Sequence, residues 1–111
     1  MSSTIQVLDK SSFSDDHSID GQVVISFVQC IRMMISYVEF ASLGKKVVSC
    51  HDCKLFKGLI FKEPTITIEL SVSFTDNKCT CSIKIKNPNK SSRIKFIPSY
   101  KGNFILDNYY P

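Results

Sequence analysis

The sequence lacks several features that would assign it to a class of proteins directly. It has no tryptophan, so eight phenylalanines and four tyrosines carry its aromatic content. No stretch reaches the roughly 18–20 uninterrupted apolar residues of a membrane-spanning helix. The longest apolar run, residues 23–38, contains Gln29 and Arg32 and is better read as a buried helix. A secretory signal pattern is also missing. We therefore expect a cytoplasmic protein with no membrane partner.

Five cysteines are present, and the expected compartment favours reduced thiols. Cys50 and Cys53 form a CxxC motif, and Cys79 and Cys81 form a CxC motif. Four thiolates can bind zinc. However, residues three apart in an extended strand point to opposite faces, which separates Cys50 from Cys53. Cys79 and Cys81 occupy inward positions of an alternating strand, where cysteine is a normal core residue. We expect no metal site.

Acidic residues are scarce in the second half of the chain. The net charge is +4, and residues 77–106 contain no acid at all. This basic half would either attract an acidic partner, such as an acyl carrier protein, a phosphorylated cofactor or nucleic acid, or form a solvated lysine-rich sheet face that prevents edge pairing. Its lysines alternate with core residues and not with exposed aromatics. Because stacking platforms are then missing, nucleic acid is not the partner we expect.

A chain of 111 residues predicts one domain spanning residues 1–111, with a core of modest size. Self-association would bury further surface, so we expect a homodimer or a heterodimer with a second chain of the same fold. Residues 5–8 are expected to form a short strand. Residues 9–21 are rich in serine and aspartate and indicate a loop.

One long helix is predicted over about residues 27–43. Its apolar residues recur at helical spacing and cover most of its circumference, so other structure should wrap it. Ser26 and Gln29 match a capping box at its start. The polar residues step by three and four and form one stripe: Gln29, Arg32, Ser36 and Glu39.

After the helix the apolar period changes to two. Residues 65–75 and 78–87 alternate strictly, with a turn at Asp76 and Asn77. Residues 93–97 return, and Phe104 and Ile105 indicate a short edge segment. The pattern predicts an α+β fold, in which an antiparallel meander over about residues 46–98 surrounds the central helix.

Asp16, His17, Asp20 and Arg32 stand at a recognisable spacing. Together they resemble the signature of the A-factor synthase-like hot-dog family, the enzymes of γ-butyrolactone autoregulator biosynthesis. More loosely, His17 and Gly21 are similar to the histidine–glycine pattern of hot-dog dehydratases of fatty-acid and polyketide synthesis. The resemblance implies a single hot-dog domain, with an antiparallel sheet wrapped around one long central helix.

The resemblance also implies a site. His17, Asp20 and Gln29 would be the catalytic residues, and Gly21, Arg32 and Ser36 would bind substrate. The substrate would be an acyl group on the phosphopantetheine of an acyl carrier protein or coenzyme A, with no further cofactor.

Local alternatives remain open for the residues of this site. His17 would then be an exposed loop histidine, and Gln29 a capping residue only. Arg32 would pair with Glu39 or Asp20 within the fold.

Two functions follow from these patterns. The first is a dehydratase-like or butyrolactone-synthase-like enzyme, a hydro-lyase or acyltransferase acting on a 3-hydroxyacyl or 3-ketoacyl thioester in polyketide or fatty-acid-derived secondary metabolism. The second is a catalytically degenerate hot-dog domain that binds acyl groups or serves as a structural partner subunit. Gln29 stands where the related families carry glutamate, and an amide cannot exchange a proton as a carboxylate does.

Overall fold

A computed structural model describes residues 2–12, 18–19, 22–42, 45–61, 63–87, 91 and 93–108. The elements follow one another in the order β1 (Ser2–Asp9), a short 3-10 turn η1 (Lys10–Ser12), β2 (Ser18–Ile19), β3 (Gln22–Ile25), α1 (Phe27–Ser42), β4 (Lys45–Leu55), β5 (Leu59–Ile60), β6 (Thr65–Thr75), β7 (Lys78–Lys86) and β8 (Phe96–Asn108).

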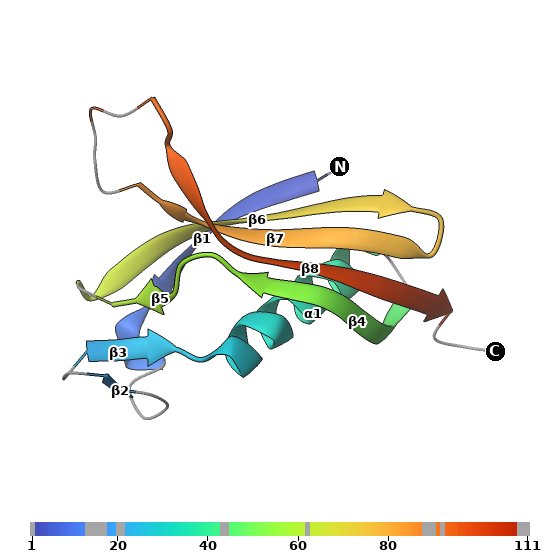
Figure 1. Cartoon of the computed structure of the whole chain (residues 1–111), viewed down its shortest axis with the longest axis horizontal. Helices are drawn as coiled ribbons and strands as arrows, with labels where there is room; N and C mark the ends of the chain where they lie inside the picture. The colour runs from blue at the N-terminus through green and yellow to red at the C-terminus, as the bar shows by residue number, and fades with distance from the viewer. Residues whose placement is uncertain are drawn as a thin grey trace.

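Two antiparallel sheets organise these strands. The larger has five strands in the order β1-β6-β7-β8-β4, and the smaller has three in the order β2-β3-β5. Helix α1 lies along one face of the larger sheet, and the small sheet lies near the start of the helix (Figure 1). Strands β1 and β4 lie at the two opposite edges of the larger sheet.

The strict alternation predicted for β6 and β7 is confirmed. Ile68, Leu70 and Val72 are buried on β6, and their neighbours Thr67, Ser71 and Ser73 point to the other face. On β7 the buried residues are Cys79, Cys81 and Ile83. The connecting turn is also as predicted: Thr75 pairs with Lys78, and Asp76 takes a left-handed backbone angle, φ 55°, which aspartate tolerates better than most residues.

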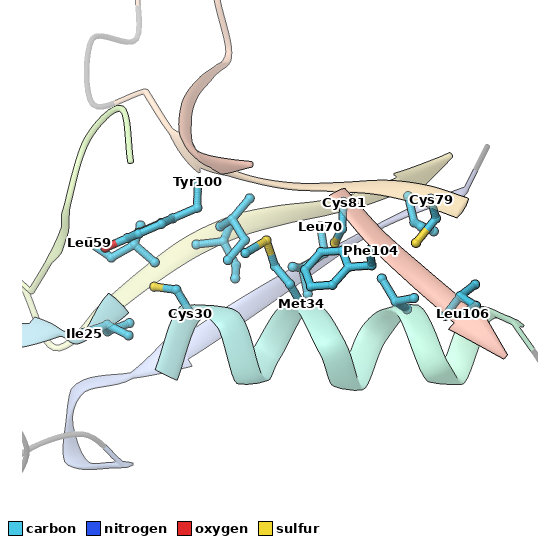
Figure 2. Packing of buried hydrophobic residues seen from close by; sticks show 14 of the residues in the cluster. Ile25, Cys30, Met34, Leu59, Leu70, Cys79, Cys81, Tyr100, Phe104 and Leu106 are labelled. Carbon is cyan, nitrogen blue, oxygen red and sulfur yellow. The ribbon is translucent and has the colours of Figure 1, made fainter. Parts of the chain in front are cut away.

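The core lies between the helix and the sheet. Cys30, Met34 and Val38, spaced by four along α1, are fully buried. Figure 2 shows Met34 and Cys30 pointing from the helix toward sheet residues that include Phe104 and Tyr100. The opposite stripe of α1, made of Val28, Arg32, Ser36 and Phe40, is exposed, and Phe40 keeps 78% of its surface accessible. The sheet thus covers one side of the helix, and its wrapping around the helix stays a prediction.

Strand β8 differs most from the expectation. It runs without a break over 13 residues and lies inside the sheet, between β7 and β4, instead of ending near residue 98 with a separate edge segment. Its inward positions are Tyr100, Gly102, Phe104 and Leu106. Gly102 interrupts the apolar period because a Cβ there would stand 3.1 Å from the Cys53 Sγ and from the Phe104 ring. Gly102 is therefore required by packing, and it conceals in the sequence that the strand is continuous.

The other boundaries differ less. Strand β1 is longer than the expected residues 5–8, because it pairs with β6 over eight residues from Ser2 to Asp9. The helix is described to Ser42, and residue 43, its expected end, lies outside the described residues. Residues 59–60 lie within the range of the predicted meander but pair with β3 in the small sheet.

Candidate functional site

Gln29 forms the predicted capping box with Ser26 at the start of α1. The Ser26 Oγ accepts the backbone N–H of Gln29 at 3.2 Å, and the Gln29 Oε1 accepts the backbone N–H of Ser26 at 3.2 Å. The Ser26 hydroxyl also donates to the Gln29 Oε1 at 3.4 Å. This reciprocal pair satisfies two backbone donors that a helix start leaves unpaired. The side-chain oxygen of Gln29 therefore stabilises the start of the helix.

Arg32 is not the partner of Glu39, which was one of the alternatives. The Glu39 Oε2 instead accepts the backbone N–H of Val47 at 2.9 Å and joins α1 to β4. Arg32 is exposed, and its side chain makes no hydrogen bond or ion pair with the described part of the chain. Asp20, the other partner considered for Arg32, lies outside the described residues. A guanidinium with no partner among the described residues can bind an anionic or carbonyl group of a ligand.

Arg32 and Ser36 lie together in a groove between α1 and the edge of the five-stranded sheet. The groove has a volume of about 500 Å³. Its wall from the sheet comes from β1 and β6, and its wall from the helix comes from one side of α1; the lining residues are Thr4, Gln6, Arg32, Met33, Ser36, Tyr37, Phe40 and Leu70. Half of these side chains are apolar and half are polar, which suits a ligand with a hydrocarbon part and a polar end.

A hydrogen bond joins β1 to Tyr37, one of the lining residues of the groove. The Ser2 Oγ lies 3.2 Å from the Tyr37 hydroxyl and ties the beginning of β1 to the second half of α1. Arg32 and Tyr37 are the only titratable side chains among its described lining residues. Neither is a carboxylate or an imidazole, so this surface can bind and orient a ligand but does not supply the histidine or the carboxylate expected for the acyl site.

His17, Asp20 and Gly21 lie outside the described residues, as does Asp16. Of the six residues predicted for the site, the structure thus brings Arg32 and Ser36 together and places Gln29 at the helix start. The predicted catalytic role of Gln29 and the roles of the other three stay predictions.

Sequence reasoning missed most of the groove. Met33, Tyr37 and Phe40 follow one another at spacings of four and three, so they could have been recognised as a second stripe beside Arg32 and Ser36. Thr4 and Gln6 carried no such signal, because nothing in the sequence shows that β1 pairs with β6 and so comes to face the helix.

A second histidine, His51, is described on β4. It pairs across the sheet with Asn103, whose Oδ1 accepts the Thr80 hydroxyl at 2.9 Å. The His51 Nε2 lies 3.1 Å from the Ser49 Oγ. His51, Thr80 and Asn103 line a cavity of about 340 Å³ that shares no lining residue with the α1–β1 groove. His51 therefore does not supply the imidazole expected for the acyl site.

Three of the cysteines are core residues. Cys30, Cys79 and Cys81 are buried, and burial raises the pKa of the Cys30 thiol to about 11 and that of Cys81 to about 12. The part of the chain that the structure describes contains no group of three or more side chains able to bind a metal ion. It also contains no helix long and apolar enough to cross a membrane.

Comparison with known proteins finds similarity at the level of structure. No family model matches the chain, and no curated protein sequence matches it. An uncharacterized protein from Erwinia carotovora subsp. atroseptica has a similar structure, with a TM-score of 0.77, 15% identity, and coverage of 98% of this chain and 84% of that one.

A second similar structure is an N-terminal dehydratase from the difficidin assembly line. Its TM-score is 0.74 at 11% identity, and the match covers 99% of this chain and 39% of that one. Identities this low show the fold alone. Together with the antiparallel sheet packed on one helix, they show that this chain has a hot-dog-like fold.

Proposed function

We propose that the protein binds an acyl thioester of an acyl carrier protein or coenzyme A, with part of the ligand in the α1–β1 groove. The observation that carries the proposal is Arg32, an exposed guanidinium without an internal partner in the described structure, beside the apolar surface of Met33, Phe40 and Leu70. The fold is shared with an assembly-line dehydratase, which supports the same ligand class.

The two halves of the groove would contribute differently to binding. The apolar side chains would cover the acyl chain, each buried CH₂ contributing about 0.8 kcal/mol. Arg32 would bind a phosphate of the phosphopantetheine or the thioester carbonyl, and a hydrogen bond to a charged group contributes about 1.5–3 kcal/mol. Ser36, one turn away on the same stripe, would donate a further hydrogen bond.

Arg32 is tested by direct binding. Titration of the protein with medium-chain acyl-coenzyme A in a calorimeter should show binding by wild type. Arg32→Gln should weaken it about tenfold or more, which corresponds to about 1.4 kcal/mol. Arg93→Gln is the matched control, because Arg93 is also exposed but does not line the groove. Absence of binding by wild type at every chain length, or an equal loss in both variants, would contradict the proposal.

The catalytically degenerate form of this function is favoured by one observation, the use of the Gln29 oxygen in the capping box. We infer that the protein acts as an acyl-binding or partner subunit, as a homodimer or with a second hot-dog chain, without a catalytic carboxyl group at position 29. Turnover of 3-hydroxyacyl- and 3-ketoacyl-carrier protein by wild type and by His17→Ala separates the two forms. Turnover by wild type that His17→Ala abolishes would establish the enzyme instead.

A further inference from the structure

Strand β4 contains an irregularity at the CxxC motif. Cys50 pairs with Phe104 and His51 with Asn103, but the next pair is Lys54 with Lys101. Two residues, Asp52 and Cys53, therefore stand opposite the single residue Gly102, which defines a β-bulge. Asp52 takes the left-handed backbone angle that the bulge requires, with φ 52°.

The bulge corrects the expectation that Cys50 and Cys53 point to opposite faces. Cys50 pairs with the inward residue Phe104. Cys53 also lies inward, because its Sγ stands 3.1 Å from the place where a Cβ of the inward residue Gly102 would be. Since the bulge absorbs one residue, the two cysteines are neighbours on one face, as residues two apart in a regular strand would be.

The two cysteines are neighbours on this face. In a regular strand, residues two apart have Cα atoms about 6.6 Å from each other, which is the upper end of the range of about 4.4–6.8 Å that disulfides span. The two thiols also interact in the structure. Burial has the largest effect in raising the pKa of the Cys53 thiol, and the neighbouring Cys50 thiol raises it further. Gly102 leaves the space that the Cys53 sulfur occupies.

Accessibility separates this pair from the other cysteines. Cys50 is exposed and Cys53 is half-buried, whereas Cys30, Cys79 and Cys81 are buried. The pair lies on an edge strand that has a partner, β8, on one side only. A small oxidant can therefore reach Cys50 without opening the core.

We propose that Cys50 and Cys53 are a redox-active dithiol that a small-molecule disulfide, such as oxidised glutathione, converts to an intramolecular disulfide. The Cys50 thiolate attacks one sulfur of oxidised glutathione, forming a mixed disulfide and releasing one glutathione thiolate. The Cys53 thiolate then attacks the Cys50 sulfur and releases the second. Two protein thiols lose two electrons, the glutathione disulfide gains them, and the two protons pass to the released thiolates.

The chain offers a matched internal control for this reaction. Trypsin cleaves after lysine and arginine, so Cys50 and Cys53 lie together in the peptide of residues 47–54, and Cys79 and Cys81 lie together in residues 79–84. The second pair also shares one strand face, but it is buried on the internal strand β7. The two peptides thus compare a pair of cysteines that the oxidant can reach with a pair that is buried.

The full chain is reduced, incubated folded with oxidised glutathione, quenched with an alkylating reagent and analysed by mass spectrometry. The 47–54 peptide should lack two hydrogens and take no alkyl group, and excess dithiothreitol should reverse this. The 79–84 peptide should take up alkyl groups on both cysteines once the protein is unfolded. Cys53→Ser should accumulate one glutathione on Cys50, and Cys50→Ser should react at least tenfold more slowly than Cys53→Ser.

Three results would overturn the proposal: two alkyl groups on the 47–54 peptide after oxidation, a lasting glutathione adduct on wild-type Cys50, or a disulfide between Cys50 residues of two chains. The wild-type peptides alone decide this, so the test stands even if a variant fails to fold. Because the groove shares no lining residue with this pair, failure of acyl binding would leave the proposal unaffected.

Discussion

Removing either half of the capping box at the start of α1 should destabilise the protein. Ser26→Ala deletes the acceptor of the Gln29 N–H, held at 3.2 Å, and should lower the free energy of unfolding by about 1 kcal/mol. Gln29→Ala deletes the acceptor of the Ser26 N–H and should cost about 0.5–1 kcal/mol, the net value of one hydrogen bond. The double variant should cost less than the sum, because each single change already breaks the reciprocal pair.

Gln29→Glu distinguishes the capping role from a catalytic one. A carboxylate can make the same hydrogen bond and lies at the positive end of the helix dipole, so this variant should gain about 0.3–1 kcal/mol at pH 7. Both interactions favour the ionised form and lower the carboxyl pKa in the folded state. The gain should therefore be present above the unfolded pKa of about 4.3 and be lost as the pH falls. A carboxyl group held ionised in this way is a poor acid, so dehydratase activity should not appear.

Urea unfolding followed by circular dichroism measures these changes. Ser36→Ala is the control, since Ser36 is exposed in the middle of the same helix and its replacement should change stability by less than about 0.5 kcal/mol. The capping role of Gln29 would be contradicted if Gln29→Ala were neutral while Ser26→Ala is costly, or if Gln29→Glu destabilised the protein by more than about 1 kcal/mol.

Met34→Ala should lower the free energy of unfolding by about 2–5 kcal/mol, because Met34 is fully buried between α1 and the sheet. A loss below about 1 kcal/mol in urea unfolding would contradict this packing. Gly102→Ala should cost about 1–3 kcal/mol, since the new Cβ would meet the Cys53 Sγ and the Phe104 ring at 3.1 Å. The same change should cost less in a Cys53→Ala background, and an equal cost in both would refute the contact. Stability should also fall as the pH rises from about 9 toward 11. Burial raises the pKa of the Cys30 thiol from 9.0 to about 11. The unfolded chain therefore loses this proton at a lower pH than the folded protein, which favours unfolding. Unfolding midpoints measured across that pH range test the fall, and Cys30→Ser should reduce it.

The elements with strong local patterns could be predicted from the amino-acid sequence alone. Strict alternation over residues 65–75 and 78–86 fixed two strands and their faces, because side chains in a strand alternate between the two sides of a sheet. Helical spacing after Ser26 fixed α1 and its start, since Ser26 and Gln29 satisfy each other's backbone donors within one turn. Local chemistry was sufficient for both.

How distant segments meet could not be predicted in this way, because it depends on the folded protein as a whole. The pairing of β1 with β6 brings Thr4 and Gln6 opposite Arg32 and forms the groove, and no local pattern encodes that pairing. The bulge at Asp52 turns Cys53 to the face of Cys50, which the spacing of the two cysteines in a regular strand would forbid. In both cases the deciding contact joins residues far apart in the chain, so it arises from packing of the whole sheet and not from the periodicity of any one segment.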